Sequence, residues 1–264
     1  MKMTGETLCV DLGLITKWTY CAMDGEPLGM VGRYENGTDK KDIVPFFKGS
    51  QDTWKVGITL TPRPLYGQEK LTKHDKNKAV FVVEGEKAAF AMQGLGCTAL
   101  TSLGGSNAAK QSDWSVLSGF KIVYLLPDND GAGEHYIKDV YQEISQLQVP
   151  PTINILRFSE LEEAGDIVDW IQELTNDWDG YALIDKSLHK SIRESLKEKL
   201  DDAEPVPEDW KLEGGAGKGE PCFNNLIPNE IKTKIPAIKA VTCFNKKFIF
   251  TSSFNKTVSE ICFK

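Results

Sequence analysis

The feature that most constrains the fold is a series of short apolar segments that alternate with helix-forming segments between residues 79 and 156. Ala79-Val-Phe-Val-Val is apolar throughout, as expected of a strand covered on both faces. Strands separated by helices form right-handed crossovers, so the sequence predicts an α/β fold with a parallel sheet flanked by helices. The other expected strands are 98–101, 121–126 and 152–156, and the expected helices are 86–93 and 132–147.

The chain divides into three regions by pattern. Residues 1–76 predict a small β-rich module, because Asp24-Gly25 and Asn36-Gly37 separate apolar runs in the manner of tight hairpins. Residues 77–200 contain the alternating pattern and two trailing helices. Residues 201–264 predict a linker rich in Pro, Gly and acids, followed by a basic tail to which we assign no structure.

Charge and cysteine use exclude several classes of protein. The net charge of −7 disfavours a wholly basic nucleic-acid binder, and residues 77–200 hold 19 acidic against 11 basic residues, which suits a cation site. Six cysteines without a C-x2-C pair disfavour structural zinc and favour reduced thiols in a cytoplasmic protein. No apolar run is long enough for a membrane span.

Three acidic residues follow two of the predicted strands directly. Glu84 comes after strand 79–83, and Asp128 and Asp130 come after strand 121–126. If these strands are neighbours, their carboxyl ends bring three carboxylates together, and such a group favours a hard cation such as Mg²⁺. The alternative is that each carboxylate only caps a helix or closes a turn.

Glycines accompany these acids. Gly85 and Gly131 let the chain turn sharply from a strand into the following helix. The helix N-termini that result expose N–H groups that can hold phosphate.

The motifs VFVVEGEKAAFAMQ, TSLGG and IVYLLPDNDGAG, in this order, resemble the Toprim domain of phage- and plasmid-type DNA primases. The family pattern is a Glu after one strand and Asp-x-Asp after a later one, which Glu84 and Asp128-x-Asp130 match. Gly32-Arg-Tyr-Glu and Arg63-Pro-Leu-Tyr66 resemble the segment that precedes Toprim in such proteins.

The resemblance implies a primase-like nucleotidyltransferase that uses Mg²⁺ or Mn²⁺ to make RNA primers on single-stranded DNA from nucleoside triphosphates. Its expected setting is phage, plasmid or mobile-element replication beside a separate helicase. Glu84, Asp128 and Asp130 would be catalytic and bind metal. The remaining expected site residues are Asp166 and Asp169 for metal, Gly85, Lys87, Gly104, Gly105 and Gly131 for phosphate, and Arg33, Lys40, Lys41, Lys55 and Arg63 for nucleic acid.

Several alternatives remain open at this level. Asp166 and Asp169 could equally belong to a solvated helix face, Lys87 could be an ordinary helix lysine, and hairpin lysines are usually just solvated. Trp54 and Tyr66 are candidates for base stacking or for the core. A Toprim nuclease and a non-catalytic replication-associated binding module are the alternative functions. The Gly-rich stretch 214–219 lacks the spacing of a phosphate loop, so we expect no helicase motor in this chain.

Overall fold

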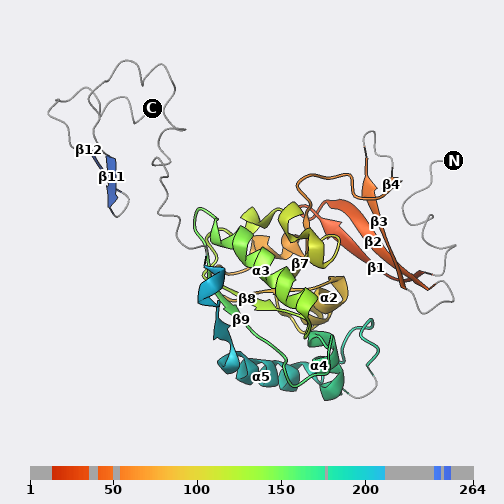
Figure 1. Ribbon diagram of the computed structural model, residues 1–264. Coiled ribbons are helices and arrows are strands. Elements are labelled where there is room, and N and C mark those ends of the chain that lie inside the picture. Colours follow the sequence, from red (N-terminus) through yellow and green to blue (C-terminus); the bar gives the residue numbers. More distant parts are fainter. Residues whose placement is uncertain are drawn as a thin grey trace. The chain divides into compact units, whose positions relative to one another are not determined.

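The computed structural model describes residues 14–35, 41–49, 54–175, 178–211, 241–244 and 247–250. The chain separates into two units, residues 1–211 and 212–264. Two sheets and their helices make up the first unit, and one hairpin is described in the second. Figure 1 shows the elements of each unit.

The N-terminal region of the first unit is a four-stranded antiparallel sheet, as expected for a β-rich module. Gly25, with φ of 91°, donates its N–H to Ala22 O at 2.9 Å, which closes the predicted Asp24-Gly25 hairpin. Asn36-Gly37 lies outside the described residues. The strands follow the order β1 (Leu14–Cys21), β2 (Pro27–Glu35), β3 (Lys41–Lys48) and β4 (Trp54–Val56).

The second sheet has six strands in the order β10-β9-β8-β6-β7-β5. The four central strands run parallel, which confirms the predicted α/β class, whereas the two edge strands are antiparallel to their neighbours. The sheet is therefore mixed. Its strands are β5 (Leu65–Tyr66), β6 (Val80–Val83), β7 (Ala99–Ser102), β8 (Ile122–Leu126), β9 (Thr152–Ile155) and β10 (Glu204–Pro205).

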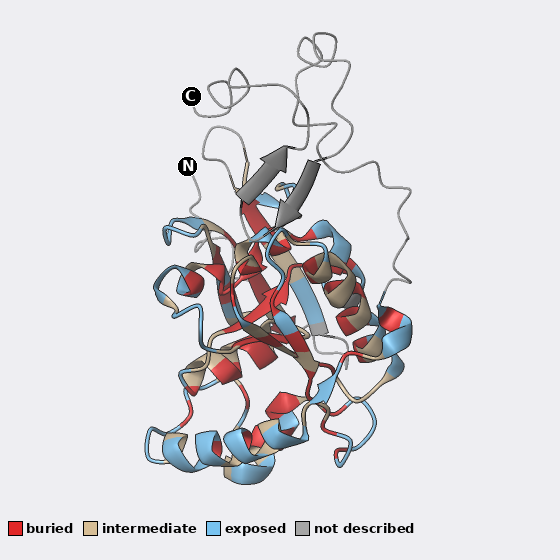
Figure 2. Ribbon diagram, turned by 90° about the vertical axis from the view of Figure 1, so that its left-hand side faces the viewer, coloured by how far each residue is buried: buried red, intermediate tan, exposed pale blue. Residues whose placement is uncertain are grey.

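Helices cover both faces of this sheet. The helix α3 (Gly131–Ser145) packs on the face that contains Val80 and Val82, and the opposite face packs against α2, α4 and α5. All four residues of β6 are buried for this reason, and Figure 2 shows buried residues concentrated along the central strands. The helices on the second face are α2 (Glu86–Gly94), α4 (Ile167–Thr175) and α5 (His189–Lys199).

Short 3₁₀ segments connect these elements. They are Gln68–Lys73, Ser106–Gln111, Trp114–Leu117, Leu200–Asp202 and Glu208–Trp210. Part of the expected linker is folded, because β10 pairs with β9 and Trp210 is buried in the same core cluster as α3.

In the second unit, β11 (Val241–Phe244) and β12 (Lys247–Phe250) form an antiparallel hairpin. No helix in the described part of the chain is long and apolar enough to cross a membrane.

Candidate metal centre at the ends of β6 and β8

The strands β6 and β8 are direct parallel neighbours, which was the condition for the three predicted carboxylates to meet. Val83 lies opposite Leu126 in the register. Glu84 and Pro127 therefore leave the sheet side by side, and Asp128 follows one residue later. The topology brings the carboxylates to the carboxyl ends of the central strands, where parallel α/β sheets bind their ligands.

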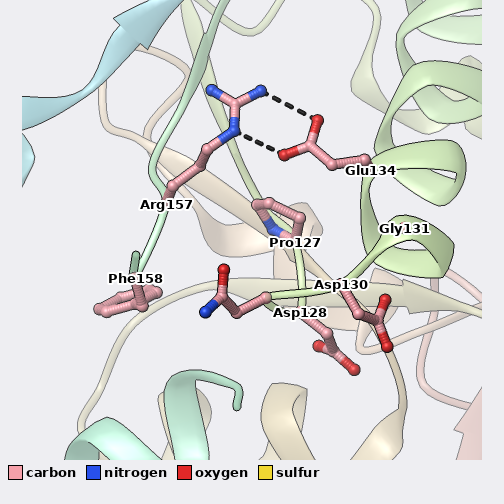
Figure 3. Close-up of a pocket in the computed structure, with 8 residues that line it drawn as sticks. Pro127, Asp128, Asp130, Gly131, Glu134, Arg157 and Phe158 are labelled. Atoms are coloured by element: carbon pink, nitrogen blue, oxygen red, sulfur yellow. Dashed lines mark hydrogen bonds and ion pairs between the residues drawn. The ribbon is translucent and has the colours of Figure 1, made fainter. Parts of the chain in front are cut away.

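The loop after β8 fixes the two aspartates. Figure 3 shows the Asp128 and Asp130 carboxylates pointing to the same side of the loop. Asp130 is also the N-cap of α3, because its Oδ1 accepts the N–H of Gly133 at 2.7 Å. A Cβ at Gly133 would lie 2.4 Å from the carbonyl oxygen of Asp128, so only glycine lets the first turn of α3 approach this loop.

The charges of the site converge on Asp128. The pKa of Asp128 is raised from its ordinary value of 3.8 to about 8. Burial is the largest cause of this shift, and the negative charges of the neighbouring carboxylates contribute the rest. In decreasing order of effect these are Glu84, Asp166, Asp130 and Asp169. Electrostatic effects of this kind require the carboxylates to be near neighbours. The site therefore gathers four carboxylates around a partly buried Asp128, and a cation would relieve their repulsion.

Asp166 and Asp169 have a structural role in addition to their charge. The Oδ1 of Asp166 accepts the N–H groups of Val168 at 2.6 Å and Asp169 at 3.1 Å, and the Oδ2 of Asp169 accepts the N–H of Asp166 at 2.9 Å. This reciprocal cap begins α4. Burial, followed by the charge of Asp169, raises the pKa of Asp166.

The candidate ligands are carboxylate oxygens, which hard divalent ions prefer. Their negative charges repel one another, so a bound cation would stabilise them. In the described part of the chain, however, no group of three or more His, Cys, Asp or Glu side chains is already placed to hold an ion. Binding would therefore have to draw the carboxylates inward from their present positions.

The residues predicted to contact phosphate occupy two loops. Gly85, Gly104 and Gly105 adopt φ values of 82°, 108° and 77°, so Gly85 makes the sharp turn that was predicted, whereas Gly131 is not among the glycines with positive φ. Gly131 begins α3. Their contact with phosphate stays a prediction.

Lys87 is not an ordinary solvated lysine. Its side chain is half-buried at the start of α2, and its Nζ lies 4.8 Å from the ring centroid of Tyr181. Its positive charge also lowers the pKa of Asp166, although other causes dominate there. The ammonium group is thus close to the acidic site.

The predicted nucleic-acid contacts are spread over several elements. Arg33 lies over the same ring as Lys87, with its Cζ 5.2 Å from the centroid of Tyr181. Arg63 donates from Nη1 to Leu103 O at 3.0 Å, and Lys55 is exposed on β4. Lys40 and the side chain of Lys41 lie outside the described residues.

The two aromatic candidates for base stacking have structural positions instead. Tyr66 is 8% exposed, and its ring centroid lies 5.5 Å from that of Tyr20 in the core. Trp54 packs against the small cluster that contains Met30 and Phe46.

The structure also contains an ion-pair group that the sequence analysis did not identify. Arg157 pairs with Glu134 through Nε and Nη2 and with Glu204 through Nη1 at 2.8 Å. Together with Asp128 and Asp130 it lines a hollow of about 220 Å³, and Figure 3 shows the two aspartate carboxylates pointing away from Arg157. No local pattern could have revealed it, because Glu134 and Glu204 are 23 and 47 residues from Arg157 in sequence.

Comparison with known families agrees with this geometry. The family model of the Toprim domain matches residues 79–161, which include Glu84, Asp128 and Asp130. These residues form a Toprim domain. No curated protein is significantly similar in sequence to the chain.

Solved DNA primases are among the similar structures. A DNA primase domain from Pseudomonas aeruginosa is 17% identical with a TM-score of 0.46, covering 72% of this chain and 51% of that one. The catalytic core of Escherichia coli primase is 16% identical with a TM-score of 0.45, covering 72% and 52%. The chain therefore spans about half the length of either primase.

Proposed function

We propose that the chain is a primase-like nucleotidyltransferase that depends on Mg²⁺ or Mn²⁺. The observation that carries the proposal is the convergence of four carboxylates on Asp128, which lies with Glu84 and Asp130 at the adjacent ends of β6 and β8 in the Toprim match. Phosphoryl transfer requires neutralisation of phosphate charge at a fixed place, and a carboxylate group of this kind supports it by holding divalent metal.

In this proposal Asp128 and Asp130 bind the metal, and Glu84 binds metal or accepts the proton of the attacking 3′-hydroxyl. Asp166 and Asp169 add negative charge from the cap of α4 and are candidates for a second ion. The bound metal would supply neutralisation of the incoming triphosphate and activation of the nucleophile. Lys87, beside Asp166, and the glycine turns at Gly85, Gly104, Gly105 and Gly131 are the proposed phosphate contacts.

The proposed template is single-stranded DNA and the proposed substrates are nucleoside triphosphates. Basic side chains from the N-terminal region and from the loop before β5 would contact the DNA backbone, and binding of this type weakens as salt rises. The proposed setting is cytoplasmic, in phage, plasmid or mobile-element replication with a separate helicase. The basic residues concerned are Arg33, Lys40, Lys41, Lys55 and Arg63.

A primer-synthesis assay tests this function. The protein is incubated with single-stranded DNA, labelled ribonucleotides and Mg²⁺ or Mn²⁺, beside Asp128→Asn and the control Asp201→Asn, which changes an exposed aspartate in a 3₁₀ segment. Short RNA products that disappear only in Asp128→Asn support a primase.

Other outcomes select other functions. Shortened template that depends on Asp128 would indicate the nuclease instead. DNA binding without product, unchanged in Asp128→Asn, would indicate a replication-associated binding module and refute catalysis.

A further inference from the structure

Three fully buried hydroxyl side chains lie next to the acidic site and take no part in the chemistry proposed above. Thr101 and Ser102 end β7 and are 1% and 2% exposed, and Tyr136 on α3 is 0% exposed. Burying polar groups costs free energy unless they form hydrogen bonds with one another or with the backbone. The hydrogen bonds of these three side chains therefore determine whether their burial is tolerated.

The three hydroxyls form one chain of hydrogen bonds. The N–H and the Oγ of Ser102 each lie 3.2 Å from the Tyr136 hydroxyl oxygen and donate to it. The Tyr136 hydroxyl oxygen also lies 3.5 Å from Thr101 Oγ1, in a contact in which either oxygen can donate. Thr101 Oγ1 also accepts the N–H of Gly85 at 3.0 Å.

One end of this hydrogen-bond chain is Gly85, the residue directly after Glu84. Gly85 has φ of 82° and ψ of 154°, a conformation that other residues rarely adopt, and it is the N-cap of α2. Glycine populates many φ and ψ values, so a hydrogen bond from another segment helps to hold Gly85 in this turn. The Thr101 hydroxyl supplies that contact from the neighbouring strand β7.

The other end of this hydrogen-bond chain lies on the helix that Asp130 caps. Tyr136 belongs to α3, which begins at its cap Asp130, so the same helix that holds the Asp-x-Asp loop also carries the Tyr136 hydroxyl. Burial raises the pKa of Tyr136, and the charge of Glu84 adds a small contribution to that shift.

We infer that Thr101 and Tyr136 are positioning residues, which hold the Gly85 turn and thereby set the place of Glu84 relative to Asp128 and Asp130. This inference rests on the proposed metal site and adds to it the residues that determine its geometry. Groups that orient metal ligands commonly affect metal affinity 10- to 100-fold when they are removed.

The test compares two substitutions at one position. Thr101→Val keeps the shape of the side chain but removes the hydroxyl, whereas Thr101→Ser retains the hydroxyl. Mn²⁺ and Mg²⁺ affinities are measured by titration calorimetry on the full chain. We expect Thr101→Val to weaken binding about tenfold and Thr101→Ser to remain within about twofold of the unchanged protein.

Tyr136→Phe is the second variant, and Thr72→Val is the matched control. Tyr136→Phe removes the hydroxyl that bonds Thr101, and we expect about a threefold loss of affinity. Thr72 uses its hydroxyl to bond Met23 O at 2.6 Å, outside the acidic site, so its variant should bind the ion normally.

The results separate positioning from folding and from the function itself. Thermal unfolding in EDTA reports stability, and a purely structural role would lower stability while leaving the affinity unchanged. Normal affinity in both Thr101→Val and Tyr136→Phe would overturn the inference while leaving the metal site intact. If Thr101→Val does not fold, Tyr136→Phe decides alone. Failure of the unchanged protein to bind either ion would overturn the metal site and the positioning role together.

Discussion

Replacing Asp128 by Asn should stabilise the metal-free protein, and increasingly so as the pH rises. Asp128 has a pKa of about 8 in the folded chain, against an ordinary value of 3.8, because of burial and the four neighbouring carboxylates. The folded state thus prefers the protonated acid. That preference contributes fully below about pH 4 and is lost as the pH rises through 8, where the folded chain must carry the extra charge.

The magnitude follows from the shift. A displacement of about four pKa units corresponds to a cost of about 5 kcal/mol at pH 8. Because Asp128 is partly exposed and the loop can relax, we expect the cost of ionising it in the folded chain to be about 2 kcal/mol. Asparagine has almost the same shape and no charge, so Asp128→Asn should escape this cost.

Urea unfolding in EDTA at pH 4 and pH 8 measures the effect. Asp128→Asn should be near the unchanged protein at pH 4 and more stable by about 2 kcal/mol at pH 8. The control Asp201→Asn should follow the unchanged protein at both values. Equal pH dependence in Asp128→Asn and the unchanged protein would refute the reasoning, because it would show that Asp128 is ionised at no cost.

Two further predictions concern stability. Gly133→Ala should cost about 2–4 kcal/mol in chemical unfolding, because its Cβ would meet the backbone of Asp128, whereas Gly131→Ala meets nothing within 4 Å and should be within about 0.5 kcal/mol of neutral. Equal effects would contradict this packing. Tyr20→Phe should cost about 1–3 kcal/mol, since the Tyr20 hydroxyl donates to buried Glu86 at 2.7 Å. A loss below about 0.5 kcal/mol in the same assay would show that this bond is not formed.

The sequence predicts the centre of the fold well because that part follows local rules. The apolar run 79–83 and the alternation with helices predict β6 and the other strands of the parallel sheet, whereas the adjacency of β6 and β8 is known only from the observed strand order. Glu84, Asp128 and Asp130 then come to one edge by topology alone.

Other features arise only when distant segments meet. The edge strand β10 has two residues, one of them proline, and no periodic pattern could reveal it. The bond between Thr101 and Tyr136 joins residues 35 positions apart, so their identity as polar core residues is invisible in either segment.

The role of the caps could be anticipated only in outline. Asp130 and Asp166 each cap a helix, which is the alternative that the sequence left open, and they also raise the pKa of Asp128. A carboxylate can cap with one oxygen and contribute charge with the other. Sequence patterns alone therefore cannot choose between the structural and the metal-binding interpretation.

Calorimetric titration of the metal-free protein with Mn²⁺ and Mg²⁺ at pH 7, in two buffers of different ionisation enthalpy, tests the central claim most directly. We expect saturable binding that is accompanied by proton release, because the raised pKa of Asp128 favours its protonated form and the side chain must ionise to hold the metal. Asp128→Asn should lose at least about tenfold in affinity together with the proton release, while Asp201→Asn keeps both. Absence of binding in the unchanged protein, or equal binding by Asp128→Asn, would contradict a metal centre at this edge of the sheet.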